Sequence, residues 1–378
     1  MSLLPAIRKA GVESPLSLWE RVRVRAPILR ERVRVRAPGG FTRRGPAGFT
    51  LVELLVVIVI IGILAGLAFG ALSVTRQNAR VEKTRATVTK LNHVVMEVYN
   101  SYRYRRVPLS DAQITQIAQQ WYGYDPASGP LSLKWVALIR LAALRDIVRM
   151  EMPDHRSDLY VPGTNNWRGS LVPGLSLPSV YQAYASRATA MGDNATAECL
   201  YMIVMLAGGE EARQQFSDDE IGDTDGNGLP EFIDGWGRPI YWLRWAPGFN
   251  ESDVQPNIPA DPPADRDFAI DQAVRYDHDP FDTRKVDFAL VGDSDPRYQA
   301  TGGKRAVGAW RLVPLIYSAG PDGEYGLWVN LKDKSYAWSL NATYAAVSDP
   351  DLNKNVLMGQ PVFPTFYDNI HNHRLEVR

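Results

Sequence analysis

The sequence predicts an α+β fold in which a long N-terminal helix packs on a C-terminal antiparallel sheet, with a helical block inserted between the two. Three observations support this prediction. No proline interrupts the chain between Pro46 and Pro108, apolar residues with helical spacing continue through residues 109–216, and strand-like segments come only after these helices. Helices that precede the strands are typical of α+β domains.

Charge divides the chain into a basic head and an acidic body. The 378 residues include 42 basic and 42 acidic side chains, but residues 1–48 alone hold 11 basic and 3 acidic ones. The acidic remainder argues against nucleic acid as a partner. Cys199 is the single cysteine, so an intrachain disulfide and a thiolate metal cluster are excluded. The five histidines lack the spacing of a zinc enzyme.

The first long element is predicted to cross a membrane. From Leu54 to Leu72, 19 consecutive residues are apolar or glycine, which is enough helix to span a bilayer core. Arg43 and Arg44 lie just before this run. Positive charge on that flank predicts a cytoplasmic N-terminus and an exported body.

The residues at the start of this run resemble a known signal. The stretch Gly48-Phe-Thr-Leu-Val-Glu-Leu-Leu-Val-Val-Ile58 is similar to the class III signal of type IV pilins and type II secretion pseudopilins. The resemblance implies a pilin-like fold, cleavage after Gly48 by a membrane prepilin peptidase, and N-methylation of Phe49 as the new first residue. It also implies other pseudopilin subunits as partners in a homo- or hetero-filament.

Glu53 is the fifth residue of the chain that such cleavage would leave. A carboxylate at the head of a membrane helix is costly unless it meets a partner. The free α-amino group of a neighbouring cleaved subunit could be that partner, so we expect Glu53 to set the register between subunits during assembly. The alternative is a glutamate that only reaches the membrane surface in an ordinary signal anchor.

Beyond the membrane segment, an apolar stripe predicts that the helix continues as a soluble one. Its members are three or four residues apart and therefore share one helix face: Val88, Leu91, Val95, Val98 and Tyr102. Periodicity and composition further predict helices over 131–152 and 197–216 and strands over 239–245, 286–291 and 310–318.

The strongest chemical motif is a 12-residue stretch that begins at Asp223. Oxygen-bearing side chains occupy positions 1, 3, 5, 9 and 12, and a glycine occupies position 6, as in the calcium loop of an EF-hand. The pattern predicts a Ca²⁺ site in preference to a solvated acidic turn. Because a strand-like segment follows, we expect an isolated calcium loop. The expected ligands are Asp223, Asp225, Asn227, the carbonyl of Leu229, Glu231 and Asp234.

Two further stretches extend the resemblance into the C-terminal half. Asp234-Gly-Trp-Gly-Arg-Pro239 and Ser318-Ala-Gly-Pro-Asp-Gly323 resemble signatures of the major pseudopilins of type II secretion. In that family the segment after the second signature helps to build a calcium site. The resemblance therefore implies Asp322 and Glu324 as candidate ligands of a second metal site.

The chain is expected to divide into five segments of different composition. They are a disordered, cleaved leader (1–48), the pilin helix (49–106) with its transmembrane part (54–72), a helical insert (107–220), the calcium loop with the sheet (221–340), and a C-terminal tail (341–378).

The function that the resemblance implies is a structural subunit of a type II secretion pseudopilus. Such a subunit is inserted among the lipids of the bacterial inner membrane with its body in the periplasm, and then joins a filament in the periplasm or at the cell surface. A type IV pilus subunit or a pilin-anchored adhesin is the alternative.

A third reading is a membrane-anchored exported hydrolase, because carboxylates gather at Asp277, Asp279 and Asp282 and again at Asp293 and Asp295. No Ser/His/Asp or Cys/His set accompanies them. We therefore expect no enzyme.

Overall fold

The computed structural model describes residues 49–161, 164, 166–256, 276–286, 310–329, 347–349, 354–356 and 358–374. The predicted leader, residues 1–48, lies outside this set. The chain divides into two units, with the boundary between Ile63 and Leu64. Helix α1 (Leu51–Ser101) begins in the first unit and ends in the second.

Helix α1 starts at a capping box and is apolar over its first turns. The hydroxyl of Thr50 accepts the N–H of Glu53 at 3.2 Å, and the Glu53 carboxylate accepts the N–H of Thr50 at 2.9 Å. Large apolar side chains from Leu51 to Leu67 are exposed. By length and composition, Leu51–Tyr104 can cross a membrane. The predicted long apolar N-terminal helix is therefore confirmed.

The second part of α1 buries the predicted apolar stripe. Four of its five members are fully buried, namely Val88, Leu91, Val95 and Tyr102. Val98 is only partly buried, and the neighbouring Tyr99 is buried instead. The Tyr99 hydroxyl donates a hydrogen bond of 3.2 Å to the carbonyl of Leu312, which attaches the helix to the C-terminal half.

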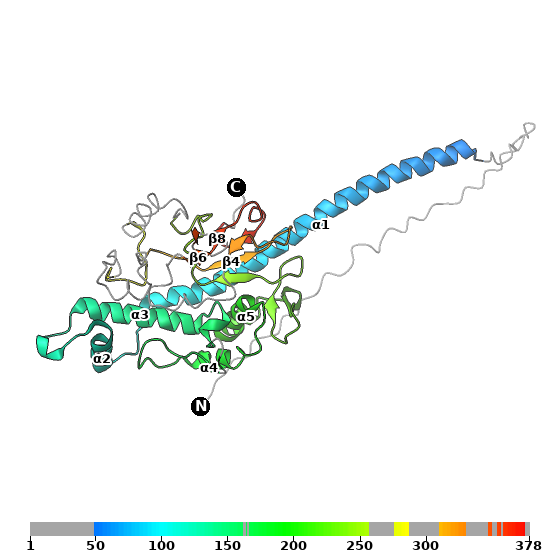
Figure 1. The fold of residues 1–378 in the computed structure, drawn as a ribbon. Coiled ribbons are helices and arrows are strands. Elements are labelled where there is room, and N and C mark those ends of the chain that lie inside the picture. The colour runs from blue at the N-terminus through cyan, green and yellow to red at the C-terminus, as the bar shows by residue number, and fades with distance from the viewer. Residues whose placement is uncertain are drawn as a thin grey trace, which may run out of the picture. The chain divides into compact units, whose positions relative to one another are not determined.

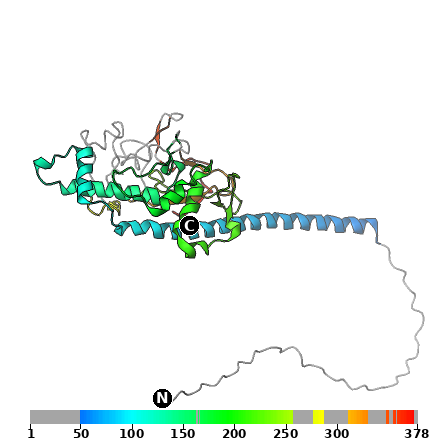
Figure 2. The same ribbon diagram turned by 90° about the horizontal axis from the view of Figure 1, so that it is seen from below.

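Residues 107–216 are mainly helical, as the periodicity predicts. The helical elements that follow α1, from residue 102 to residue 220, are the short η1 (Tyr102–Tyr104), then α2 (Asp111–Tyr122), η2 (Pro126–Ser128), α3 (Leu133–Glu151), η3 (Arg156–Asp158), α4 (Ser179–Ala185), α5 (Ala195–Met202), the π-helix η4 (Ile203–Ala207), α6 (Gly209–Arg213) and η5 (Asp218–Glu220). Helix α3 lies beside the second part of α1 in two perpendicular views (Figure 1, Figure 2). Near their ends, the Tyr102 hydroxyl donates to the Glu151 carboxylate at 2.7 Å.

A buried ionic network joins the helical block to the strands that follow. The guanidinium of Arg244 donates to the Asp158 carboxylate at 2.9 Å and to the Met152 carbonyl at 2.8 Å, and all these atoms are buried. Burial raises the pKa of Asp158 to about 7, although the charge of Arg244 opposes this shift.

The C-terminal half is built from small antiparallel sheets. The largest among the described residues has the order β3 (Tyr241–Leu243), β4 (Leu315–Ser318) and β9 (Ile370–His371). The remaining pairs are β1 (Ile221–Gly222) with β2 (Glu231–Phe232), β5 (Leu327–Trp328) with β8 (Gln360–Pro361), and β6 (Val347–Asp349) with β7 (Lys354–Val356). Together with the helices they give the predicted α+β class.

The predicted strands over 239–245 and 310–318 contain β3 and β4. The strand predicted over 286–291 lies outside the described residues, except for Val286, which is in a turn. Strand β9 comes from the segment expected to be a tail, and it is only two residues long, too short to carry a period-two pattern.

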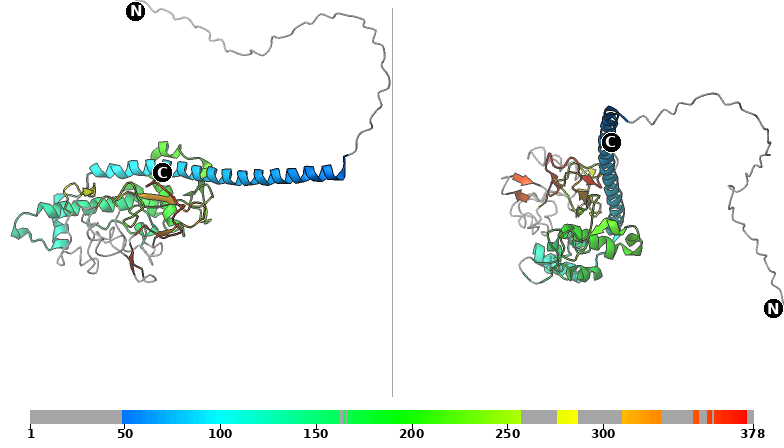
Figure 3. Two further views of the ribbon diagram at one scale, coloured as in Figure 1. Left: turned by 90° about the horizontal axis from the view of Figure 1, so that it is seen from above. Right: turned by 90° about the vertical axis from the view of Figure 1, so that its right-hand side faces the viewer.

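The central sheet separates two apolar cores. Trp242 and Ile316 belong to the larger core, with the second part of α1 and the helical block. Their neighbours Leu243, Leu315 and Tyr317 belong to a smaller core that also holds Phe249 and Phe366. This division follows from the alternation of side chains along a strand. Figure 3 shows the helices of the block and the strands gathered along the same part of α1.

Candidate functional site

The predicted calcium loop is the connection of the β1–β2 hairpin. Gly222 pairs with Glu231, so residues 223–230 close the end of this ladder. Asp223 organises the loop: its Oδ1 accepts the N–H of Gly226 at 2.8 Å, and its Oδ2 accepts the N–H of Gly228 at 2.9 Å. Gly226 and Gly228 have φ values of 74° and 87°, a region that favours glycine.

Two of the predicted ligands converge with a third carboxylate that the motif does not contain. Among the described residues, Glu198 of α5, Asp225 and Glu231 each place one carboxylate oxygen within 4.8 Å of those of the other two. Glu198 and Glu231 are buried, whereas Asp225 is exposed. Burial raises the pKa of Glu198 to about 7 and also raises that of Glu231.

The other predicted ligands have different surroundings. The side-chain amide of Asn227 lies between two of the carboxylates and donates to Glu198 at 2.6 Å and to Asp225 at 3.1 Å. Leu229 donates its N–H to the Asn227 amide oxygen at 2.8 Å, and its side chain packs against the larger core.

Asp234 is held away from this group. Its Oδ1 accepts the N–H groups of Trp236 and Arg238 at 2.8 and 3.0 Å, and its Oδ2 accepts the Ser318 hydroxyl at 2.7 Å. Glu231 lies in the two-residue strand β2, whereas Asp234 lies beyond the end of this strand, in the turn that its own hydrogen bonds organise. Positions 9 and 12 of the motif therefore belong to different local structures.

The sequence motif does not include Glu198, because Glu198 comes close to Asp225 and Glu231 only through the tertiary packing of α5. The only sequence signal is a lone acidic residue in the apolar stretch Ala195–Leu206. Around it, Asn194 donates to Thr224 at 2.7 Å and to Glu231 at 3.1 Å, and accepts the Tyr241 hydroxyl at 2.7 Å. These contacts fix the start of α5 against the loop.

The two signature-like stretches of the C-terminal half meet in space. Besides the Ser318–Asp234 bond, the guanidinium of Arg238 donates to the Gly320 carbonyl at 2.8 Å, and the Tyr325 hydroxyl donates to the Pro239 carbonyl at 2.6 Å. A Cβ at Gly320 would lie 2.1 Å from the Asp368 carbonyl oxygen, so this close approach requires glycine.

The residues of the predicted second metal site, Asp322 and Glu324, are exposed. Asp322 Oδ1 accepts the N–H of Glu324 at 2.8 Å, and the N–H of Asp322 donates to the Asp368 carboxylate at 2.9 Å. These bonds form a turn. Among the described residues, these carboxylates are not part of a close group of three.

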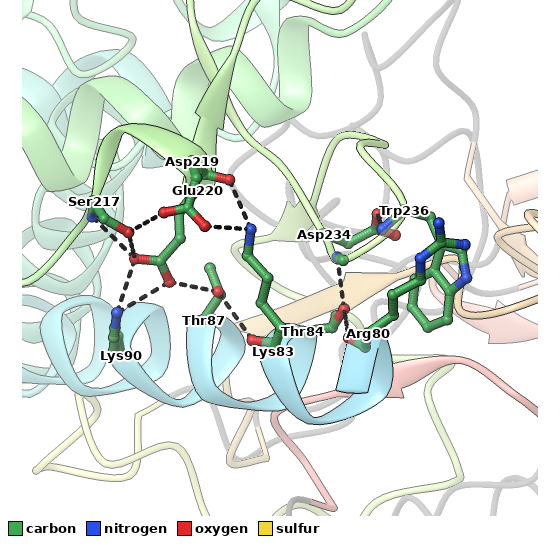
Figure 4. A network of polar contacts seen from close by, with 11 residues as sticks. Arg80, Lys83, Thr84, Thr87, Lys90, Ser217, Asp219, Glu220, Asp234 and Trp236 are labelled. Atoms are coloured by element: carbon green, nitrogen blue, oxygen red, sulfur yellow. Dashed lines mark hydrogen bonds and ion pairs between the residues drawn. The ribbon is translucent and has the colours of Figure 1, made fainter. Parts of the chain in front are cut away.

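A second polar network fastens α1 to the segments on either side of the loop (Figure 4). Lys90 of α1 donates to the buried Glu220 at 2.8 Å, and Thr87 donates to the same carboxylate at 2.6 Å. Further along, the Thr84 hydroxyl accepts the N–H of Gly235 at 2.9 Å. A Cβ at Gly235 would lie 2.4 Å from a backbone oxygen of α1, so the chain can pass this close only as glycine.

The described carboxylates that were considered for hydrolysis contact arginine or histidine side chains. Asp279 accepts from Arg145 at 2.8 Å, Asp277 pairs with Arg311 at 2.8 Å, and Asp282 contacts His278 at 3.0 Å. These contacts account for the Asp/Arg/His-rich turn as a structural element. Asp293 and Asp295 lie outside the described residues.

The N-terminal signal residues are placed for contact with other molecules. Phe49 is 82 % exposed, and Glu53 is exposed beside it. Gly62, Gly66 and Gly70 recur every fourth residue of α1, and apart from the adjacent residues and the backbone of the helix itself, no atom of the described residues lies within 4 Å of a Cβ built on any of them. Such a row of small residues permits close approach of another membrane helix. Gly48 lies outside the described residues.

Comparison with protein families finds the prokaryotic N-terminal methylation motif at residues 43–69. The chain carries a pilin-like N-terminal signal. The match covers the predicted cleavage residue Gly48 and is followed by the long apolar helix, as in type IV pilins and pseudopilins. No curated protein and no solved structure matches the chain.

This pilin-like signal indicates how the chain is processed and where it is anchored. It implies processing by a prepilin peptidase, assembly with other pilin-like subunits, and a single-pass membrane anchor in the first part of α1. The matched motif belongs to a structural family of proteins and not to a catalytic one.

Proposed function

We propose that this pilin-like precursor is a structural subunit of a type II secretion pseudopilus, cleaved after Gly48 and polymerised through its N-terminal helix to support protein export. One observation favours a subunit of a secretion pseudopilus over a subunit of a type IV pilus. The two stretches that resemble major-pseudopilin signatures are joined by the Ser318–Asp234 hydrogen bond of 2.7 Å. Chance resemblances in distant stretches have no reason to pack together.

The proposed orientation follows from the charge next to the membrane segment. Arg43 and Arg44 precede the apolar run, which favours a cytoplasmic N-terminus and a periplasmic body. After cleavage, the subunit leaves the inner membrane by stacking in a filament. The exposed glycine row of α1 suits helix-to-helix packing in the core of that filament.

A type IV pilus subunit or pilin-anchored adhesin is the second candidate. The observation in its favour is the enlarged body, because helices α2 to α6 add a helical block between α1 and the strands. Such a block could contact a surface. A single cysteine, however, excludes a disulfide-closed C-terminal loop, a feature of many type IV pilins.

The test is a deletion strain scored for secreted proteins and for surface pili in the same cultures. Loss of secreted proteins with normal pili supports the proposal, provided that the intact chain restores secretion. Loss of pili or adhesion with normal secretion contradicts it and selects the pilus class. Normal secretion and normal pili, in a strain that also lacks paralogous subunits, contradict both and leave an anchored enzyme as the remaining hypothesis.

A further inference from the structure

We propose that Glu198, Asp225 and Glu231 form a Ca²⁺ site that ties helix α5 to the β1–β2 loop. This site differs from the one that the sequence motif predicts, since it gains Glu198 and excludes Asp234. It holds for any class of pilin-like filament, because it depends only on contacts within residues 194–241.

The first argument is the uncompensated charge. Three carboxylates have oxygens within 4.8 Å of one another, and two of the three are buried. Among the described residues, no lysine or arginine forms an ion pair with any of them. Like charges at this separation repel, and a buried charge without a counter-ion is strongly unfavourable. A divalent cation removes both costs.

The second argument concerns one oxygen atom of Glu198. Glu198 is 1 % exposed, and its Oε2 is buried with no hydrogen-bond partner among the described residues. Its other oxygen, Oε1, accepts from the Asn227 amide at 2.6 Å. Buried polar atoms in folded proteins are normally satisfied, so this second oxygen of Glu198 is available to bind a cation.

The donor set selects the type of cation. All candidate ligands are oxygen atoms, and no histidine or cysteine belongs to the group. Oxygen-only sites suit hard cations, and a site of several carboxylates on an exposed loop suits Ca²⁺, which accepts six to eight ligands in variable geometry. Three carboxylates supply three to six of these oxygens, depending on whether they bind through one or both atoms.

The surroundings can supply further ligands. The Asn227 amide group donates to Glu198 and to Asp225, and a half-turn of the amide would direct its oxygen toward the same carboxylates.

The consequence is mechanical. Glu198 belongs to the helical block, whereas Asp225 and Glu231 belong to the hairpin that leads into strand β3. A cation between them cross-links the two parts at the place where Asn194 already bridges Thr224, Glu231 and Tyr241. Bound Ca²⁺ is thus expected to stabilise the packing of the helical block on the strands.

The experiment is calorimetric titration of the full chain in detergent with CaCl₂ or MgCl₂, after removal of metal by a chelator. The variants are Glu198→Gln, which keeps the shape of the buried side chain, and Asp225→Asn, which changes an exposed one. Glu210→Gln, on an exposed position of α6, is the matched control, and Asp234→Asn tests the ligand set that the motif predicts.

We expect one Ca²⁺ per chain with a dissociation constant in the micromolar to millimolar range. Glu198→Gln and Asp225→Asn should each weaken binding more than about tenfold, while Glu210→Gln and Asp234→Asn should bind as the wild type does. The proposal is overturned if the wild type does not bind Ca²⁺ at millimolar concentration or binds Mg²⁺ equally well. It is also overturned if Glu198→Gln binds normally, and loss of binding in Asp234→Asn alone restores the motif-derived ligand set.

Discussion

Ser318 donates a 2.7 Å hydrogen bond to Asp234, and both side chains are buried. The bond joins β4 to the turn before β3, so the two signature-like stretches become one structural unit. The same carboxylate accepts the N–H groups of Trp236 and Arg238. Asp234 thus organises a turn, although its position in the motif suggests a metal ligand.

Removal of this bond should destabilise the body. Ser318→Ala leaves the buried Asp234 carboxylate with one partner fewer, and hydrogen bonds to charged groups contribute about 1.5–3 kcal/mol to the free energy of unfolding. The measurement is chemical denaturation of the full chain in detergent. Ser101→Ala is the control, because Ser101 is exposed and bonds only within α1. Equal losses of unfolding free energy in the two variants would show that the Ser318–Asp234 bond stabilises the body no more than an exposed hydrogen bond within a helix.

Two lysines of α1 offer a matched comparison. Lys83 and Lys90 are 37 % and 36 % exposed, but Asp219, the partner of Lys83, is 67 % exposed, whereas Glu220, the partner of Lys90, is 5 % exposed. Lys83→Ala should cost less than about 1 kcal/mol, as is usual for surface ion pairs. Lys90→Ala should cost about 1–3 kcal/mol, because it removes a hydrogen-bond donor from a buried carboxylate. A larger loss in Lys83→Ala, measured by the same denaturation, would contradict the network in Figure 4.

The C-terminal segment should make stability depend on pH. Burial lowers the pKa of His371 to about 3 and that of His373 to about 4, and in the unfolded chain both should titrate near the ordinary histidine pKa of 6.5. The unfolded state therefore binds more protons between these values, so the stability that the neutral histidines provide is present above pH 6.5 and is lost as the pH falls toward 4. Each histidine contributes a slope of up to about 1.4 kcal/mol per pH unit.

The histidine contribution can be isolated with variants. His371→Phe keeps an aromatic ring against Phe366 and Phe249 and removes the titrating group. The free energy of unfolding of this variant should fall less steeply than that of the wild type between pH 6 and 4.5, a window inside the range that the two pKa values define. Parallel curves for the wild type and this variant would contradict burial of His371.

Glu53 has two separable roles. It closes the capping box with Thr50, and we expect its charge to meet the α-amino group of a neighbouring subunit. Glutamine preserves a capping box but not the charge. Glu53→Gln should therefore be processed and inserted normally yet fail to enter filaments, as should Glu53→Ala. Filaments isolated from cells expressing Glu53→Gln at normal yield would show that the glutamate acts only as a cap.

Long elements were predictable because their periodicity is local. The run from Leu54 to Leu72 and the stripe that begins at Val88 follow from residue spacing alone. The cluster of three carboxylates was predictable only in part. The motif contains Asp225 and Glu231, whereas Glu198 is brought next to them by the packing of α5. Asp234 lies outside this group, in a turn beyond the end of β2, and loop spacing alone does not reveal this turn.

The most direct test of the central claim is the mass of the chain extracted from bacterial membranes. A pilin-like precursor processed at its signal should begin at Phe49, lack residues 1–48 and carry one methyl group on its α-amino nitrogen. Deletion of the prepilin peptidase should restore the longer, unmethylated form. A chain that keeps Gly48 in the presence of an active prepilin peptidase, or that is cut beyond the apolar run, would contradict the assignment.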